Sequence, residues 1–307
     1  MKNIIIKNRL KQKLTGIIFI IIISNIFLIP SKGFSQFDDR PRMNYRSPRE
    51  VVFLEPLVFY NKDSANGRLD LYIEIPMNTL QFKYDMFKAE YKASCEYSIT
   101  IKDAENKTLA DNSFSESILN TEEQQKNVKS GSLFELKQYY LPPGNYKLHF
   151  TLKDKNSSNE YNKDAEFKVN DILSYKYLAS DIMLLSNYTD NGGKKEITPI
   201  INRFLGNLKS FYLFFEVVNN SDSIMNKIFI INIKNDDGKN LWNAIFEYTF
   251  NPGTNQIFEN IELANRIRGN YNIEITDKDS KEIVTKKTVN NIPPDMPVQR
   301  RGYRRNI

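Results

Sequence analysis

Apolar and polar residues alternate along most of the chain from residue 51 onward. Residues 69–75 alternate with a period of two and stop at Pro76, which cannot donate to a sheet ladder. Residues 91–102 and 146–153 alternate in the same way, and short turns rich in Asp, Asn and Gly separate such segments. No long amphipathic helix is indicated in this part of the sequence. The pattern therefore predicts an all-β protein made of short strands.

The second half of the chain repeats this scheme. Residues 211–218 and 228–233 are apolar on both faces, which is typical of central strands. Residues 241–250 alternate with Trp242 in the apolar phase, so we expect Trp242 to be buried. The polar residues 116–129 predict a loop with at most a helical turn. Together the two halves predict two tandem β-sandwiches of the immunoglobulin or fibronectin-III-like kind.

A short motif occurs once in each half and opens an alternating strand. Leu141, Gly144 and Tyr146 have the spacing of a tyrosine corner, in which the tyrosine hydroxyl bonds to backbone upstream. Gly269 and Tyr271 repeat the Gly-Asn-Tyr part of the motif. We interpret both copies as structural corners and not as an active site.

Strand content and composition divide the sequence into five parts. They are a signal peptide at 1–35, a flexible lead-in at 36–50, β-sandwich domains at 51–170 and 171–291, and a basic flexible tail at 292–307.

The first part of the chain has the features of a secretory signal. A basic stretch runs to Lys13, an apolar core of 14 residues follows at 16–29, and Gly33 and Ser35 are suited to cleavage before Gln36. An uncleaved anchor is the alternative, but spanning a bilayer takes roughly 20 apolar residues. We therefore expect an exported protein, periplasmic or extracellular, that meets a membrane only through its signal peptide before cleavage.

The net charge of +6 falls to zero if this segment is removed. Six of the 43 Lys and Arg residues, and none of the 37 Asp and Glu residues, lie in the first 35 positions. The remaining chain is neutral overall, so we expect no nucleic-acid partner. The arginine-rich tail has the alternatives of an anion-binding segment and a solvated terminus.

Candidate catalytic residues and metal ligands are scarce. His149 is the only histidine and falls on the polar phase of its strand, while Cys95 is the only cysteine and falls on the apolar phase. The turns 235–238 and 277–279 are acidic but lack the spacing of a calcium loop. We therefore predict no catalytic, cofactor-binding or metal-binding residues, and no cofactor.

Three stretches together resemble a known family. They are 67–76 with 80–82, 177–185 and 211–219, and they are similar to the N-terminal region of the exported GWxTD-domain proteins of Bacteroidetes and related phyla. The Gly-Trp-x-Thr-Asp element itself is not found in this sequence. The resemblance therefore implies architecture and export, and no activity is carried over from that domain.

These observations favour a non-enzymatic binding or scaffolding protein of the bacterial cell envelope. Its partner would be an envelope protein or a glycan, recognised through strand edges or loops. Two alternatives stay open: an envelope hydrolase with a carboxylate pair that the sequence does not single out, and a secreted adhesin or surface component.

Overall fold

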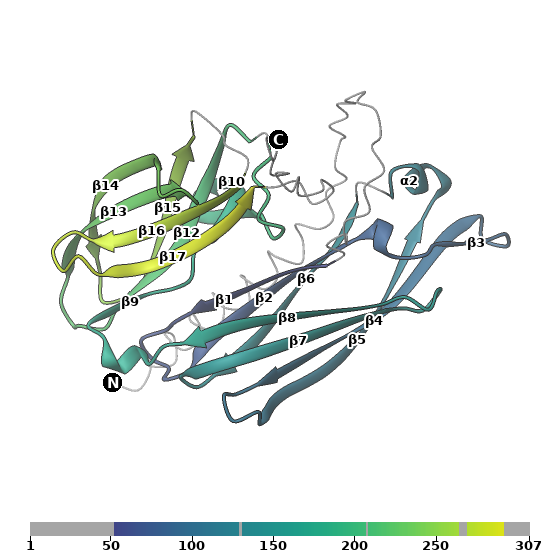
Figure 1. Cartoon of the computed structure of the whole chain (residues 1–307), viewed down its shortest axis with the longest axis horizontal. Helices are drawn as coiled ribbons and strands as arrows, with labels where there is room; N and C mark the ends of the chain where they lie inside the picture. The colour runs from purple at the N-terminus through teal and green to yellow at the C-terminus, as the bar shows by residue number, and fades with distance from the viewer. Residues whose placement is uncertain (1–51, 129–130, 207, 264–268, 292–307) are drawn as a thin grey trace, which may run out of the picture. The chain divides into compact units, whose positions relative to one another are not determined.

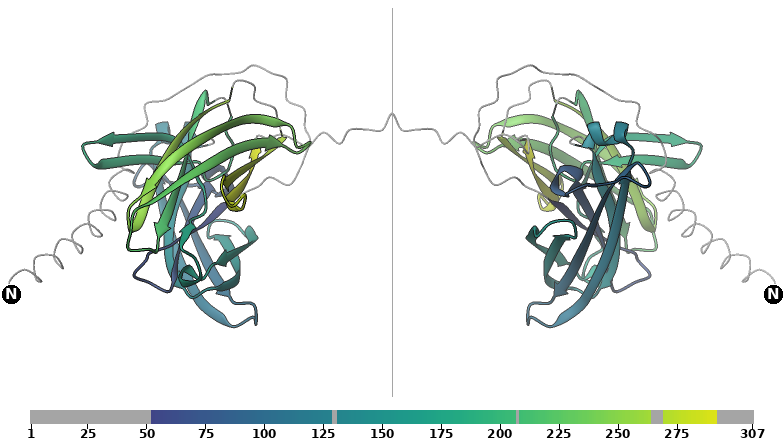
Figure 2. Two further views of the ribbon diagram at one scale, coloured as in Figure 1. Left: turned by 90° about the vertical axis from the view of Figure 1, so that its left-hand side faces the viewer. Right: turned by 90° about the vertical axis from the view of Figure 1, so that its right-hand side faces the viewer.

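A computed structural model describes residues 52–128, 131–206, 208–263 and 269–291, all of which belong to one compact unit, Arg46–Ile307. The fold is all-β, as the alternation predicts, and consists of antiparallel sheets (Figures 1 and 2). The helices whose bounds the structure gives are the short elements η1 (Met77–Thr79), α2 (Glu122–Lys126) and η3 (Ile172–Ser174). The predicted signal peptide, lead-in and basic tail lie outside the described residues.

Two sheets form the first sandwich. One has the order β1-β2-β6, with β1 at Phe53–Phe59, β2 at Gly67–Pro76 and β6 at Ser132–Leu141. The other has the order β3-β4-β7-β8, and β5 pairs with the remaining edge of β4. Its strands are β3 (Lys83–Asp85), β4 (Glu90–Lys102), β5 (Thr108–Asn120), β7 (Gly144–Asp154) and β8 (Glu160–Val169).

Two further sheets form the second sandwich. The first has the order β11-β10-β12-β15, and β9 also pairs with β12; the second has the order β14-β13-β16-β17. The strands of the first are β9 (Tyr177–Ala179), β10 (Met183–Asn191), β11 (Lys194–Pro199), β12 (Ser210–Asn219) and β15 (Gly253–Glu262). Those of the second are β13 (Met225–Asn235), β14 (Asn240–Phe250), β16 (Gly269–Asp277) and β17 (Ile283–Asn291).

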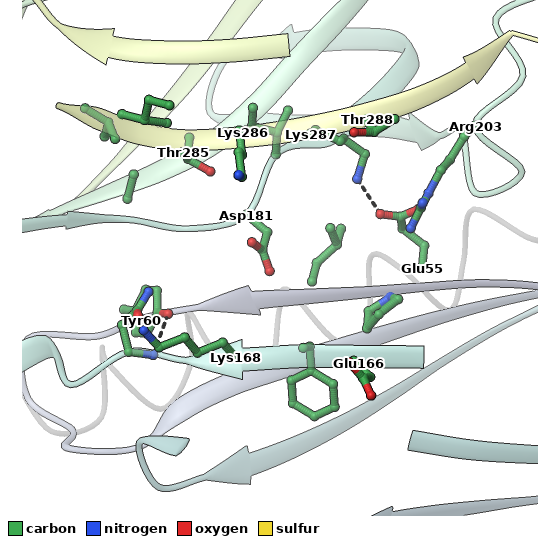
Figure 3. A pocket seen from close by; sticks show the side chains of 18 residues that line it. Glu55, Tyr60, Glu166, Lys168, Asp181, Arg203, Thr285, Lys286, Lys287 and Thr288 are labelled. Carbon is green, nitrogen blue, oxygen red and sulfur yellow. Dashed lines mark hydrogen bonds and ion pairs between the residues drawn. The ribbon is translucent and has the colours of Figure 1, made fainter. Parts of the chain in front are cut away.

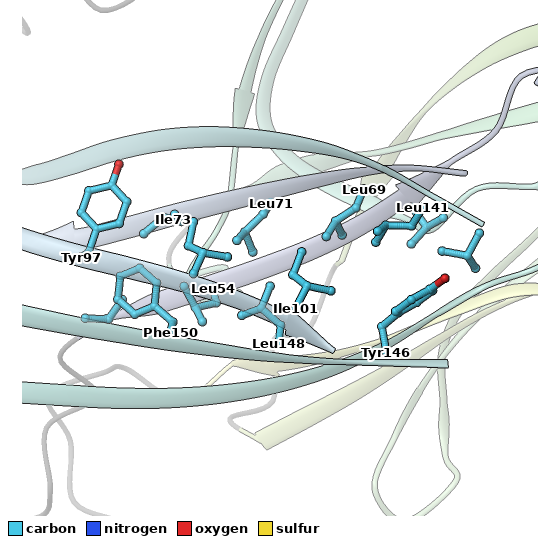
Figure 4. Packing of buried hydrophobic residues seen from close by; sticks show 14 of the residues in the cluster. Leu54, Leu69, Leu71, Ile73, Tyr97, Ile101, Leu141, Tyr146, Leu148 and Phe150 are labelled. Carbon is cyan, nitrogen blue, oxygen red and sulfur yellow. The ribbon is translucent and has the colours of Figure 1, made fainter. Parts of the chain in front are cut away.

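Each sandwich encloses a hydrophobic core made by the inward phase of its strands. In the first, Leu69, Leu71 and Ile73 of β2 face Ile101 of β4 and Phe150 of β7 (Figure 4). A second core fills the space between the sheets of the other sandwich, and a third cluster joins β1 to β10 and β12 through residues such as Leu57 and Phe214. Strand β1 is therefore buried on both faces. The predicted domain boundary near η3 stays a prediction, since both sandwiches belong to one compact unit.

Two sequence expectations differ from the structure. β5 extends to Asn120, so part of the predicted loop at 116–129 is strand, because β4 offers a ladder as far as Tyr91 and the polar side chains of β5 can face solvent. Trp242 is only half-buried, because β14 is an edge strand that, in the part of the chain that the structure describes, pairs with β13 alone. Cys95, by contrast, is buried in the first core as predicted, and burial raises the pKa of its thiol to about 11.

Candidate functional site

A buried carboxylate, Glu55, lies in the middle of the otherwise apolar strand β1. Alternation places Glu55 on the outer face of β1, with Leu57 and Phe59, toward the second sandwich. Its two carboxylate oxygens accept hydrogen bonds from Arg203 Nε and Lys287 Nζ. The side chain of Lys287 is 8% exposed and that of Glu55 is 5% exposed. Two cations therefore neutralise Glu55, which leaves it engaged and unsuited to act as a general base.

Asp181 occupies part of the open edge of β1. Its Oδ2 accepts the Val58 N–H at 2.8 Å, and its own N–H donates to the Val58 carbonyl at 3.0 Å. Lys163 Nζ donates to the Val52 carbonyl at 2.9 Å, and Pro56 has no N–H to offer. Burial raises the pKa of the Asp181 carboxyl, and the Val58 N–H opposes that shift. The edge of β1 is thus closed to a further strand.

Beside this closed edge is a cleft of about 550 Å³, which β8 and β17 border (Figure 3). Six consecutive residues of β17, 283–288, line it. Successive side chains of a strand point to opposite faces, so an unbroken run of lining residues means that the cleft follows the edge of β17. β17 pairs only with β16, so its other edge has no strand partner in the described residues. The cleft therefore exposes an unpaired strand edge.

The wall opposite β17 comes from the end of β8 and from Tyr60. Glu166, Phe167 and Lys168 lie there, and the Asn170 N–H donates to the Tyr60 hydroxyl at 3.0 Å. A neighbouring hollow of about 390 Å³ shares Glu166 with the cleft. Both hollows thus continue along the open edge of β8, whose one strand partner among the described residues is β7.

The charged side chains of the cleft that form no ion pair are mainly positive. Lys168 on β8 and Lys286 on β17 are exposed, and neither forms an ion pair with a residue that the structure describes. Glu166 is the one exposed acid of the lining, because Glu55 is engaged by two cations and Asp181 is bonded to β1. The cleft consequently favours a ligand with negative charge.

The corner residues of the first sandwich lie together, next to the cleft and outside its lining. The Tyr146 hydroxyl donates to the Pro142 carbonyl at 2.6 Å, and Leu141 and Tyr146 are both buried. A Cβ at Gly144 would come within 3.3 Å of the Tyr146 hydroxyl. The Tyr146 ring stacks on Phe167 at 5.3 Å, so the corner supports one wall of the cleft.

The second corner belongs to the other sandwich. Gly269 has φ of +138°, a conformation that favours glycine, and Tyr271 is buried in the core with its hydroxyl accepting from Asn291 Nδ2 at 3.2 Å. The two corners are therefore separate packing features, and the structure does not bring them to one site.

The other residues weighed from the sequence have ordinary structural surroundings. His149 is exposed, with Nδ1 at 2.7 Å from Asp164 Oδ1. Asp277 accepts the N–H groups of Asp279 and Ser280 within its own turn. Within the described residues, no group of three or more His, Cys, Asp or Glu side chains is arranged to hold a metal ion. No helix of this part is long and apolar enough to cross a membrane.

Sequence reasoning missed the residues that shape the cleft. A signal was present, because Glu55 is the only charged residue in the apolar run 51–60 and Asp181 is the only one in 177–185. A charged group within a buried strand indicates a specific partner. The partners Arg203 and Lys287 lie 148 and 232 residues away from Glu55 in sequence, so the pattern alone could not identify them.

No protein-family model matches the sequence, and no match was found among curated proteins. Similar solved structures include a red sea bream transglutaminase, with 7% identity, a TM-score of 0.25, and coverage of 80% of this chain and 31% of that one. A glycosyl hydrolase family 2 member from Bacteroides cellulosilyticus has 8% identity and a TM-score of 0.30, covering 71% of this chain and 26% of that one.

A further similar structure is β-glucuronidase 2 of Bacteroides uniformis, with 10% identity, a TM-score of 0.28, and coverage of 83% and 29% of the two chains. The chain thus spans less than a third of the length of these proteins. No residue role or activity is transferred from them.

Proposed function

We propose that this chain is a non-enzymatic binding protein that takes up an extended, acidic peptide segment by strand addition to β17. The observation that carries the proposal is the unbroken run 283–288, which lines the cleft along the open edge of β17. An extended peptide adds to such an edge through main-chain hydrogen bonds and gains specificity from alternate side chains. Six strand residues span about 20 Å, enough for several such bonds.

The contrast between β1 and β17 supports the choice of edge. On β1, Asp181, Lys163 and Pro56 block the open side, in the manner by which proteins protect strands from unwanted pairing. No comparable contact covers 283–288 among the described residues, although β17 borders the same cleft. Because the edge of β17 is open and the neighbouring edge of β1 is closed, an added peptide strand would pair selectively with β17.

The charge of the cleft supports an acidic ligand. Lys168 and Lys286 extend from opposite walls, and a peptide carboxylate between them would meet two cations. Glu166 would disfavour a second acidic group at its own position, which would give the ligand a register.

The carboxylates of the cleft support a binding role over catalysis. Glu55 is held by Arg203 and Lys287, and Asp181 is hydrogen-bonded to Val58. The charge of Glu55 contributes to raising the pKa of Asp181, so the two carboxylates lie near each other. Both are already bonded, however, and neither is free to act as the acid or the base of glycoside hydrolysis. Together with the predicted signal peptide, this leads us to propose an exported protein that binds an envelope protein.

Selection of peptides by the full chain tests the proposal directly. A displayed library of random heptapeptides is expected to yield sequences enriched in Asp or Glu at the one position that lies between Lys168 and Lys286. Thr285→Pro and Lys286→Pro then test the strand edge, because neighbouring N–H groups point to opposite sides of a strand. The variant that keeps its melting temperature near that of the wild type is expected to weaken peptide binding at least tenfold.

Matched controls separate shape from charge. Lys286→Ala controls for the charge that Lys286→Pro removes, and Lys286→Glu is expected to reverse the preference for acidic peptides. Lys239→Glu, at an exposed turn of the second sandwich, is expected to leave binding unchanged. The proposal is wrong if no peptide is enriched, if the folded proline variant binds normally, or if the selected peptides are cleaved.

A further inference from the structure

The end of the first sandwich that is remote from the cleft carries an apolar projection. The turn between β3 and β4 exposes Phe87 by 99% and Met86 by 80%, and Tyr84 of β3 is 51% exposed. Leu119 of β5 is also exposed, and it pairs with Lys92, which in turn pairs with Lys83 of β3. Tyr84, Met86 and Phe87 therefore stand exposed at this hairpin, which we name the β3–β4 tip, while Leu119 lies on the sheet face that carries Lys83 and Lys92.

The sheet register places the β3–β4 tip away from the peptide cleft. The chain leaves the first sandwich at Val169, which pairs with Gly144 at one end of β7. Asp154, at the other end of β7, pairs with Cys95, close to where β3 meets β4 (Figure 1). The tip and the cleft are thus separate surfaces, and the tip does not depend on the proposed peptide site.

Several contacts hold the tip in a fixed conformation. Asp85 Oδ1 accepts the Phe87 N–H at 2.9 Å, and the Tyr84 and Tyr91 rings lie 4.9 Å apart. Asn156 Nδ2 donates to the carbonyls of Gln81 and Lys92, in both cases at 2.8 Å. These bonds brace the base of the hairpin while its apolar side chains stay in solvent. Such an arrangement is expected of a surface that is covered when it functions.

Lysines surround the apolar tip. Lys83 and Lys92 form no ion pair among the described residues, and Lys88 approaches Glu90 only to 4.0 Å. The Asp85 carboxylate is bonded to the backbone of the turn. A convex apolar tip with lysines at its base matches a lipid interface, where aromatic side chains enter the acyl boundary and lysine ammonium groups stay among anionic headgroups.

We propose that the β3–β4 tip inserts into the interface of an anionic lipid bilayer. Membrane contact would then continue after removal of the predicted signal peptide, contrary to the expectation from the sequence. One small apolar tip gives weak and reversible binding, so the lysines contribute much of the affinity. A pocket on another protein is the competing occupant, and the experiment below separates the two.

A tryptophan placed at the tip reports insertion independently of the N-terminal segment. Trp242 is the only tryptophan and lies in the second sandwich, so Trp242→Phe removes the background signal. In that variant of the full chain, Phe87→Trp is expected to shift its emission to the blue with phosphatidylcholine–phosphatidylglycerol vesicles. Brominated lipids are expected to quench it. The matched control Ile245→Trp, at a position 58% exposed on β14, is expected to show neither change.

Neutralising the lysines tests the electrostatic part. Lys83→Gln and Lys92→Gln are each expected to raise the lipid concentration for half-maximal quenching about fivefold on anionic vesicles, from roughly 1 kcal/mol per lysine. On pure phosphatidylcholine they should change little. The proposal is overturned if brominated lipids quench the Phe87→Trp variant no more than the Ile245→Trp control. It is also overturned if a protein, and not lipid, shields position 87.

Discussion

Strand β7 of the first sandwich and strand β16 of the second are built to one plan. Each begins with Gly-Asn-Tyr and ends with a buried aspartate, Asp154 and Asp277. Asp154 accepts the Asn156 N–H at 2.9 Å, and Asp277 accepts the Asp279 N–H at 2.8 Å. Each aspartate thereby organises the turn that follows its strand.

The two aspartates differ in what else they bind. Asp154 Oδ2 accepts the Gln81 N–H at 2.9 Å, which ties the base of the β3–β4 tip to β7. Asp277 Oδ2 accepts the Tyr177 hydroxyl at 2.6 Å and Lys227 Nζ at 2.7 Å. In the first sandwich, the aspartate at the end of the strand therefore holds a surface hairpin. In the second sandwich, the corresponding aspartate forms a buried ion pair next to Tyr177 of β9. We therefore expect the second copy to contribute more to stability than the first.

Asp277→Ala is expected to have the largest effect. It would leave the Lys227 ammonium and the Tyr177 hydroxyl without their carboxylate, and removing one member of a buried pair costs about 3–5 kcal/mol. Urea denaturation measures this as a lower midpoint with an unchanged slope. Adding Lys227→Met to Asp277→Ala should recover part of the loss, because the unpaired cation is removed as well. An equal loss for Asp277→Ala and Asp154→Ala would contradict the comparison.

Asp154→Ala is expected to lower the free energy of unfolding by less, about 2 kcal/mol. It removes hydrogen bonds from neutral donors and leaves no buried charge without a partner. Its effect should be concentrated at the β3–β4 tip. Hydrogen exchange would show faster exchange of the amides of residues 81–92, with the amides of β16 unchanged. Uniformly faster exchange in both sandwiches would show that Asp154 has no local role.

The repeated strands could be predicted from the sequence, but the long-range hydrogen bonds and ion pairs of their side chains could not. Gly-Asn-Tyr followed by alternation is a local signal, and it placed Tyr146 and Tyr271 on the inward face of their strands, where both are buried. The sequence pattern predicts Asp277 only as part of an acidic turn. Its pairing with Tyr177, 100 residues away, depends on how two sheets come together. The cleft was missed for the same reason, since long-range pairing of Glu55 leaves no periodic signal in the sequence.

Acid should affect the second sandwich through Asp277. Burial alone would raise the pKa of this carboxyl, but Lys227, Tyr177 and the backbone N–H groups outweigh burial and lower it to about 2. A carboxyl with a lowered pKa stabilises the fold fully above its unfolded value near 4, and that contribution is lost as the pH falls toward 2. Thermal unfolding between pH 5 and pH 2 should therefore show a steeper fall in melting temperature for the wild type than for Asp277→Asn. Parallel curves would assign the acid sensitivity to other groups.

The smallest expected difference in the free energy of unfolding is between variants of the tyrosines near the start of β7 and β16. Tyr146→Phe removes the bond to the Pro142 carbonyl, which lies at an exposed residue and can bind water instead, so we expect a loss of about 0.5–1 kcal/mol. Tyr271→Phe should cost more, because it leaves the buried Nδ2 of Asn291 without its acceptor. Phenylalanine at position 146 keeps the stacking on Phe167, so peptide binding in the cleft should be unchanged in that variant. Paired urea titrations of the two variants measure the difference, and a larger loss for Tyr146→Phe would mean that the corner of the first sandwich stabilises the fold through more than this one hydrogen bond.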